Sequence, residues 1–357
     1  MRVLGFDIGG ANTKAALLET ENCRVKTLKT CIKYFPIWKR GRDALPEALR
    51  ELADQLSPEG CLDCLAVTMT AELSDAYQTK REGVNHILDC VVKEFPNTPI
   101  WVLNVEAQLV TVEEAKQSPL MVASANWAAT GWMVSRLFSN CIAVDTGSTS
   151  TSIIPIVNGR IAAEGRTDME KLANGELVYT GALRTNVAAI VSHIPLRNGV
   201  LRVSSELFAQ SGDVHLVLGN ISEEEYTVDT ADGRGKTRLE AMARLARVVC
   251  ADMEMLSQEE IAEIARYIYE RQVEQIAQAL MQVYLRVKGQ AACSVPIVVM
   301  GIGGKFLGRK AAELVGIRNV VELAEKLGSG AAAMTPSVGV ALMAAEKLEG
   351  EIQWKPL

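Results

Sequence analysis

Two turns in the sequence carry side chains that can bind phosphate together with a divalent metal ion. Each follows an apolar strand that ends in an aspartate, Asp7 or Asp145, and each contains glycine with hydroxyl or amide side chains. Glycine lets the backbone approach an anion closely, and amides that converge in a turn bind phosphate oxygens. Like charge keeps the aspartates from the phosphate, but a carboxylate can hold a hydrated Mg²⁺ that bridges to it. We therefore predict a clamp for Mg²⁺ and a diphosphate, with Asp7 and Asp145 as metal ligands.

A third glycine-rich loop, Gly301-Ile302-Gly303-Gly304, follows the apolar segment 295–300. A single D-x-G turn is common, so the prediction depends on two such turns together with this loop. Lys14 either neutralises phosphate charge or is a solvated lysine, and the sequence leaves both open. The predicted diphosphate contacts are Gly9, Gly10, Asn12, Thr13, Lys14, Thr146, Gly147, Ser148, Thr149, Gly301, Gly303 and Gly304.

Two further carboxylates, Glu72 and Asp75, follow the apolar segment 62–70, which we expect to be a strand. Open α/β sheets build their sites beyond the carboxyl ends of strands, so either carboxylate is a candidate general base. Asp7 joins them as a catalytic candidate through the metal that it would hold. The alternative is that Asp75 or Ser74 caps the following helix.

A polar loop with Asp229, Asp232, Arg234 and Lys236 precedes a helix whose start carries a capping box. Because anions are favoured at helix N-termini, we predict that these four residues contact the substrate or its diphosphate. The alternative is a solvated surface loop. Trp127 is expected to pack in the core rather than stack on a substrate, and the isolated His86, His193 and His215 suggest no metal triad.

The order of expected elements is that of an α/β protein built from two related halves. The strand-turn-strand pattern around Asp7 recurs 138 residues later around Asp145. Between the two, periodicity predicts helices at 47–56, 84–95 and 125–138 and strands at 62–70 and 99–105. Later segments predict a strand at 214–218, a strand at 295–300, and helices at 257–288 and 337–348. We expect a first domain at 1–140, rejoined by the C-terminal helix at about 336–357, and a second at 141–335.

Composition limits the classes of function. The 357 residues are 48% hydrophobic and 22% charged, with a net charge of −6, which is typical of a folded enzyme and gives no footprint for nucleic acid. Apolar runs fall far short of the roughly 18 residues of a membrane span, and no signal peptide is evident, so we expect a cytoplasmic protein. The eight cysteines are scattered and expected to be reduced, with Cys61 and Cys64 as ordinary packing residues rather than half a zinc site.

The constellation resembles the actin-like ATPase superfamily of sugar kinases, actin and seventy-kilodalton heat-shock proteins. Its order is matched by a first phosphate loop at 7–14, a connection after Thr70, a second phosphate loop at 145–152, an adenosine-type loop at 301–304 and a second connection near 337–341. The resemblance implies an α/β actin-like (ribonuclease H-like) fold with two related domains around a central cleft. A fold leaves the reaction open.

Longer strings resemble one small family, the hydantoinase/oxoprolinase-like proteins of tetrahydromethanopterin-linked one-carbon pathways. The strings lie at 7–14, 69–75, 124–127, 174–181, 229–236 and 244–252, and the resemblance covers nearly the whole chain. It implies a transferase of methanofuran biosynthesis. In that reaction the phenol of gamma-glutamyltyramine displaces diphosphate from (5-aminomethylfuran-3-yl)methyl diphosphate, with Mg²⁺ as cofactor and Glu72 or Asp75 as the acceptor of the phenol proton.

Two residues depart from related patterns. Ser152 stands where the second phosphate loop of the family usually ends in an aspartate, which shifts the expected metal binding to Asp145. Lys14 stands where ATP-dependent oxoprolinases usually carry an acidic residue, and a cation there suits diphosphate better than amide hydrolysis. The competing hypotheses are an ATP-dependent small-molecule kinase or amide hydrolase, and a nucleotide-switched protein of the chaperone type.

Overall fold

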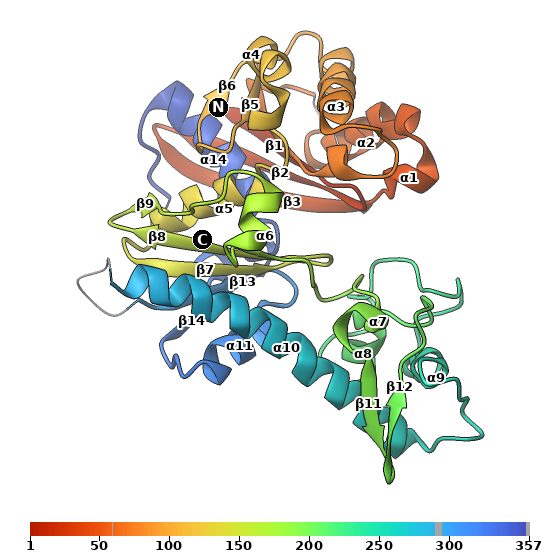
Figure 1. Cartoon of the computed structure of the whole chain (residues 1–357). Coiled ribbons are helices and arrows are strands. Elements are labelled where there is room, and N and C mark those ends of the chain that lie inside the picture. The colour runs from red at the N-terminus through yellow and green to blue at the C-terminus, as the bar shows by residue number, and fades with distance from the viewer. Residues whose placement is uncertain (59, 290–294, 355–357) are drawn as a thin grey trace. The chain divides into compact units, whose positions relative to one another are not determined.

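The computed structural model describes residues 1–58, 60–289 and 295–354 (Figure 1). Contacts divide the chain into two compact units, each described here by itself. The first unit comprises Met1–Ala143, Ile154–Lys171 and Leu323–Leu357, and the second comprises Val144–Ile153 and Leu172–Glu322. The predicted boundaries at 140 and 335 stay a prediction. No helix within the described residues is long and apolar enough to cross a membrane.

The first unit is built on a six-stranded sheet with the order β3-β2-β1-β4-β5-β6. Strand β1 pairs antiparallel with β2 and parallel with β4. The strands are β1 Arg2–Ile8, β2 Asn12–Glu21, β3 Arg24–Tyr34, β4 Cys64–Met69, β5 Ile100–Leu103 and β6 Leu109–Val110. The helices of this unit are α1 Ile37–Arg40, α2 Leu45–Leu56, α3 Lys80–Glu94, α4 Val112–Gln117, α5 Asn126–Ser135, α12 Ala324–Leu327, α13 Ser329–Ala333 and α14 Thr335–Glu349. Every helix and strand predicted here from periodicity is present.

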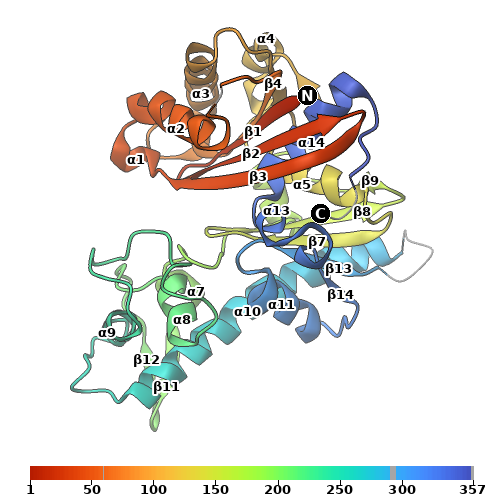
Figure 2. The ribbon, with the colours of Figure 1, turned by 180° about the vertical axis from the view of Figure 1, so that it is seen from behind.

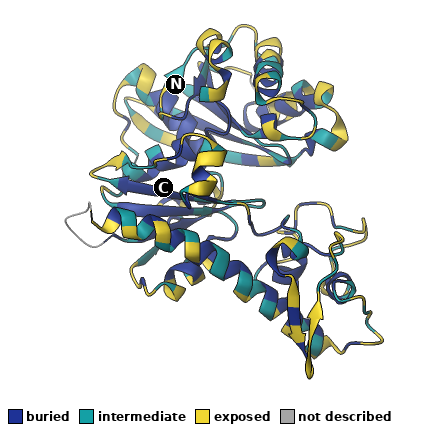
Figure 3. Cartoon of the chain, viewed as in Figure 1, coloured by how far each residue is buried: buried dark blue, intermediate teal, exposed yellow. Residues whose placement is uncertain are grey.

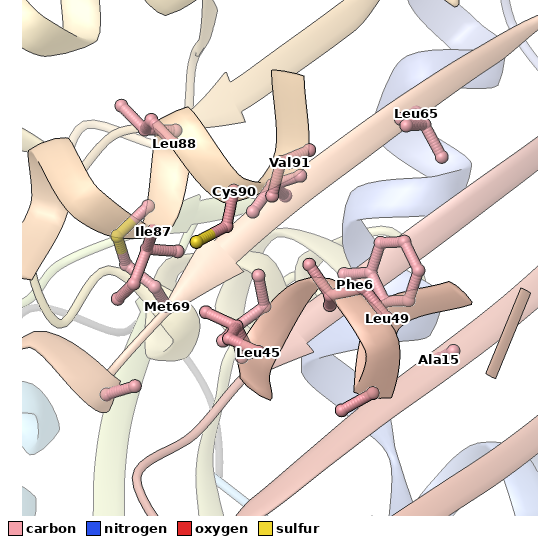
Figure 4. Packing of buried hydrophobic residues seen from close by; sticks show 14 of the residues in the cluster. Phe6, Ala15, Leu45, Leu49, Leu65, Met69, Ile87, Leu88, Cys90 and Val91 are labelled. Carbon is pink, nitrogen blue, oxygen red and sulfur yellow. The ribbon is translucent and has the colours of Figure 1, made fainter. Parts of the chain in front are cut away.

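Helices cover both faces of this sheet because alternate side chains of β1 are apolar on each face. Phe6 packs with Leu45 and Leu49 of α2 and with Val91 of α3, as Figure 4 shows. On the opposite face α14 lies against β1, β2 and β4, which Figure 2 shows from behind. A Cβ at Gly5 would lie 2.2 Å from the carbonyl oxygen of Ser337, so only glycine allows this approach. The C-terminal helix therefore packs on the strand that ends in Asp7; residues 355–357 lie outside the described part of the chain.

The second sheet has the order β10-β8-β7-β13-β14, with β9 paired to β8. Its strands are β7 Cys141–Thr146, β8 Thr151–Val157, β9 Arg160–Ile161, β10 Leu177–Val178, β13 Ile297–Met300 and β14 Val320–Glu322. In both sheets a strand-turn-strand pair lies beside later strands in the same order. This is the internal repeat that the two aspartate-bearing turns predicted.

The rest of the second unit is an elaboration around the long helix α10, Gln258–Lys288. Its predicted apolar stripe is buried, and Figure 3 shows the contrast with the exposed hairpin β11–β12. The remaining elements are α6 Asp168–Ala173, which crosses between the units in sequence, α7 Val187–Ile190, β11 His193–Leu196, β12 Gly199–Arg202, α8 Ser211–Val217, α9 Arg238–Arg247 and α11 Arg309–Leu314. The predicted capping boxes at the starts of α9 and α10 are both formed.

The predicted strand at 214–218 is wrong, because this segment is the end of helix α8. Asp213 and His215 of this helix are both fully buried. Asp213 accepts hydrogen bonds from the backbone N–H of Gln210 and from Nε of Arg244, at 3.0 and 2.8 Å. Both polar side chains can be buried because they have hydrogen-bond partners on other helices, Arg244 for Asp213 and Gln272 for His215.

Replacing Arg244 by methionine is expected to destabilise the second unit by about 3–5 kcal/mol, the usual cost of leaving a buried charge without its partner. Arg244 is fully buried and pairs with both Asp213 and Asp232. The neighbouring Arg247, which also pairs with Asp232 but is partly exposed, provides the matched control Arg247→Met. Urea unfolding should show a large loss for the first variant and a small one for the second; equal losses would contradict a special role for the buried pair.

Candidate active site

The first phosphate loop is a tight turn between β1 and β2. The N–H of Gly9 donates to the carbonyl of Asn12 at 3.0 Å, and a Cβ at Gly9 would lie 2.5 Å from that same oxygen. The carbonyls of Gly10 and Ala11 accept from the N–H groups of Ile37 and Phe35. These bonds hold the carbonyl groups of the turn in place. A loop that presents its amides to an anion needs its carbonyl groups fixed in this way.

The second phosphate loop repeats this geometry between β7 and β8. The N–H of Gly147 donates to the carbonyl of Ser150 at 2.9 Å, and these two residues stand 138 positions after Gly9 and Asn12. The carbonyls of Gly147 and Ser148 accept from the N–H groups of Ala182 and Leu183. The recurrence seen in the sequence is therefore a recurrence of hydrogen bonds as well.

The third loop packs directly on the second. The N–H of Gly303 donates to the carbonyl of Thr146 at 2.9 Å. Gly301 has a φ of +77°, and a Cβ there would lie 2.4 Å from the carbonyl oxygen of Thr146 and 2.6 Å from Oδ1 of Asp145. The structure thus brings Asp145, Thr146, Gly301 and Gly303 together, and Gly304 begins the short π-helical turn Gly304–Gly308.

Asp7 forms an ion pair with Lys14 in its own hairpin. Asp7 and Lys14 are paired across β1 and β2, and Nζ of Lys14 lies 3.7 Å from Oδ2 of Asp7. The sequence left open whether Lys14 binds phosphate or is a solvated lysine. Neither alternative included this ion pair with Asp7. The equivalent of Lys14 in the second hairpin is Ser152. A metal at Asp7 would compete with this ammonium group.

Two of the predicted diphosphate ligands have buried side chains. Thr13 and Thr146 are fully buried, and the hydroxyl of Thr146 lies 3.5 Å from that of Thr151, which donates to it. Ser148 and Thr149, in contrast, are partly exposed and lie in the turn itself. The hydroxyls most suited to touch a phosphate are therefore those of Ser148 and Thr149.

Glu72 and Asp75 lie in very different surroundings. Glu72, in the turn Ala71–Leu73 after β4, is 1% exposed and accepts a 2.7 Å hydrogen bond at Oε1 from the hydroxyl of Ser124. Its Oε2 is buried and has no hydrogen-bond partner among the described residues. Burial raises the pKa of the Glu72 carboxyl. Asp75 is exposed in the loop that follows.

The alternative role for Asp75 and Ser74, capping of helix α3, is wrong. The N-cap of α3 is Thr79, whose side chain accepts from the N–H of Glu82. The loop 74–78 lies between Glu72 and this cap, and α3 begins at Lys80, four residues before the predicted start at 84. Of the two candidate bases, Glu72 has the surroundings of a functional carboxylate, since buried groups with a raised pKa cluster at active sites.

The loop that contains the four predicted substrate contacts is tied to helix α9. Asp232 accepts hydrogen bonds from Arg247 and Arg244, at 2.9 and 3.2 Å, and from the N–H of Arg234. The backbone carbonyl of Asp229 accepts from Gln210, and Nζ of Lys236 lies 5.7 Å from the ring of Tyr226. Asp232 is thus engaged in ion pairs of its own unit, and the predicted substrate contact of this loop stays a prediction.

A model of the hydantoinase/oxoprolinase family matches residues 63–347. The chain belongs to this family. It is 38% identical over 348 residues to the (4-{4-[2-(gamma-L-glutamylamino)ethyl]phenoxymethyl}furan-2-yl)methanamine synthase of Methanocaldococcus jannaschii, an alignment that covers 97% of this chain and 98% of that one. A synthase of the same name from Methanococcus vannielii is 34% identical over 215 residues, 60% of this chain and 94% of the relative. The predicted family is confirmed.

Among solved structures, nucleotide-free acetone carboxylase aligns with a TM-score of 0.53 at 11% identity, covering 96% of this chain and 70% of that one. At this identity the likeness concerns the fold alone. Together with the paired sheets it confirms the α/β, actin-like fold that the order of the phosphate loops and connections predicted.

Arg184 was missed by the sequence analysis and lies beside the second phosphate loop of this family member. Its Nη1 donates to the hydroxyl of Thr149 at 3.1 Å, and its N–H donates to the carbonyl of Ser148. A Cβ at Gly181 would lie 2.6 Å from backbone atoms of Thr149, so this glycine allows the segment with Arg184 to approach. The string 174–181 pointed to the segment, but it stops three residues short of the arginine.

Trp127 and the histidines are accounted for within the fold. Trp127 is buried, as expected for a packing residue, with Nζ of Lys171 3.9 Å from its ring centroid. His86 bonds the hydroxyl of Tyr77, and burial lowers the pKa of His215 to about 3. In the described part of the chain no cluster of three His, Cys, Asp or Glu side chains is arranged to hold a metal ion. Burial raises the pKa of the Cys64 thiol to about 12.

Proposed function

We propose that this protein forms the aryl ether of methanofuran biosynthesis, (4-{4-[2-(gamma-L-glutamylamino)ethyl]phenoxymethyl}furan-2-yl)methanamine. The substrates are (5-aminomethylfuran-3-yl)methyl diphosphate and gamma-glutamyltyramine, and diphosphate is released. The proposal is carried by 38% identity over nearly the full length of a synthase with this product. The two glycine turns support it, because they suit a diphosphate leaving group.

The reaction exchanges one carbon–oxygen bond for another. The bond between the furylmethyl carbon and the diphosphate oxygen breaks, and its electron pair leaves with diphosphate. A lone pair of the phenol oxygen forms the new bond, and the phenol proton passes to a base. Because the furylmethyl carbon can carry positive charge, stabilisation of the leaving group is expected to supply much of the rate enhancement.

Glu72 is the proposed base. Its Oε2, which has no partner among the described residues, can accept the proton. The raised pKa of Glu72 is closer to the pKa of the phenol than the pKa of an ordinary carboxyl is. Ser148, Thr149 and Arg184 are proposed to bind diphosphate oxygens in the second unit. In the first unit, Gly9, Gly10, Asn12 and Lys14 keep the role predicted for their loop.

The carboxylate of Asp145 suits Mg²⁺, a hard cation that prefers oxygen ligands, and it lies at the glycine-lined position next to Gly301. Mg²⁺ would neutralise charge on the departing diphosphate. Asp7, which pairs with Lys14, is proposed as the second ligand. The part of this chain in the reaction is to hold the diphosphate, orient the phenol and accept its proton.

The test is a paired assay with purified protein and Mg²⁺. One tube receives the furylmethyl diphosphate with gamma-glutamyltyramine, and the other receives ATP with the corresponding furanmethanol. Diphosphate and an ether of the expected mass in the first tube alone would establish the synthase. ADP in the second tube would make the protein a kinase, and silence in both would overturn the proposal.

Arg184→Gln is expected to weaken the binding of Mg²⁺-diphosphate about 10- to 100-fold, because a charge-assisted hydrogen bond contributes about 1.5–3 kcal/mol. Calorimetry with inorganic pyrophosphate measures this without the furan substrate. Arg202, an exposed arginine on β12 of the same unit, gives the charge-matched control Arg202→Gln. Equal affinities for the two variants would remove Arg184 from the site.

A further inference from the structure

Glu72 lies at one end of a hydrogen-bonded row of four side chains in the first unit. We propose that Ser124 and Lys80 are positioning residues of the ether-forming reaction, which hold Glu72 ionised with Oε2 as the atom that accepts the proton, while Asp168 fixes Lys80. The inference rests on the proposed function, in which Glu72 takes the phenol proton.

The contacts in this row are short and continuous. The hydroxyl of Ser124 donates to Oε1 of Glu72 at 2.7 Å, and Nζ of Lys80 donates to that hydroxyl at 3.2 Å. Nζ of Lys80 also donates to Oδ2 of Asp168 at 2.8 Å. The four residues come from the turn after β4, the start of α3, the turn before α5 and the start of α6. Four segments distant in sequence therefore converge on one carboxylate.

The number of available protons determines the direction of each bond. A lysine ammonium group has donors only, and a serine hydroxyl has a single proton. Since Lys80 donates to the oxygen of Ser124, the serine proton is available for Glu72 alone. Oε1 of Glu72 must then be an acceptor, and an incoming proton is directed to Oε2, the oxygen without a partner among the described residues.

The backbone is shaped to make this arrangement. Ser124 has a φ of +52°, a left-handed conformation that few residues other than glycine adopt and that the surrounding structure must impose. A Cβ at Gly83 of α3 would lie 2.6 Å from Cα of Glu72, so glycine lets this helix, with Lys80 at its start, pack against the carboxylate's turn. Such local costs are typical of functional sites.

The charges around Glu72 act with opposite signs. Burial is the largest influence and raises its pKa, the Ser124 hydrogen bond and the charge of Lys80 lower it, and the charge of Asp168 raises it. Tyr77, on the same loop, is neutral because burial raises the pKa of its phenol far above neutrality. A base must be ionised to act, so kcat/KM rises with pH through the pKa of Glu72. Removing Ser124 or Lys80 therefore moves this acidic limb to higher pH, and removing the charge of Asp168 moves it to lower pH.

The experiment compares wild type with Ser124→Ala, Lys80→Met and Asp168→Asn. Their pH profiles of kcat/KM for ether formation should show upward shifts of about one to two pH units for the first two, and a downward shift for the third. In parallel, the Glu72 carboxyl is titrated by NMR in protein carrying ¹³C-labelled glutamate, with the signal assigned from Glu72→Gln. Opposite shifts cannot result from a general loss of structure.

The outcomes separate this inference from the proposed function. If wild type forms the ether but the acidic limbs of all four proteins coincide, the positioning role is overturned and the synthase stands. If wild type forms no ether, the proposed function fails and the catalytic role falls with it. The NMR titration then still reports whether Ser124 and Lys80 hold Glu72 ionised, and an unchanged titration would overturn that part as well.

Discussion

Replacing Glu72 by glutamine is expected to lower kcat for ether formation by about 10²–10⁴-fold, the usual contribution of a positioned general base. Glutamine keeps the shape and can still accept the hydrogen bond from Ser124 at its amide oxygen, but it cannot take a proton. Substrate binding should change little, because Glu72 acts on the phenol proton and not on the diphosphate. Initial rates of pyrophosphate release, with mass detection of the ether, measure both parameters.

The matched control is Asp75→Asn. Asp75 lies three residues away but is exposed, so its loss should change kcat by less than about threefold. Circular dichroism and thermal unfolding check that both variants fold. A Glu72→Gln protein with the kcat of wild type, or an Asp75→Asn protein that loses activity in its place, would reverse the assignment that burial favours.

The sequence predicted the turns and helices around the site better than the side-chain contacts within it. The turns that carry Asp7 and Asp145 were evident because backbone geometry restricts them to glycine and small polar residues, and this restriction is local. The loop at Gly301 was found for the same reason. Helix starts were found where a capping box marks them, as at Thr237 and Ser257. The start of α3 was placed at 84 instead of 80, although Thr79 and Glu82 match the same S/T-x-x-E signature.

Contacts between distant segments were invisible to the sequence. Nothing near Glu72 indicates that Ser124 lies 2.7 Å away, and nothing near Asp168 indicates that it meets Lys80. The same limit holds at α8, where the buried Asp213 pairs with Arg244, 31 residues away in the sequence. Polar residues buried by long-range pairing have no signature in local periodicity, so an interpretation based on one segment assigns them to the surface.

Replacing Asp145 by asparagine is expected to lower kcat/KM on the order of 10²–10³-fold at a fixed Mg²⁺ concentration. The loss corresponds to about 3–4 kcal/mol, in line with the several kcal/mol that a bound metal contributes to a charged leaving group. Part of the activity should return at high Mg²⁺, since the amide oxygen is a weaker ligand rather than none. The measurement is a Mg²⁺ titration of pyrophosphate release, with circular dichroism as the check on folding.

Two variants sharpen this test through the internal repeat. Asp7→Asn tests whether the first hairpin also holds Mg²⁺, with Nζ of Lys14 3.7 Å from that carboxylate. Ser152→Asp supplies a carboxylate at the position that Lys14 occupies in the first hairpin, and it should lower the Mg²⁺ concentration at half-maximal rate. If Asp7→Asn instead proves the more damaging, the metal is held mainly by the first hairpin, and the ion pair with Lys14 must open before Mg²⁺ binds.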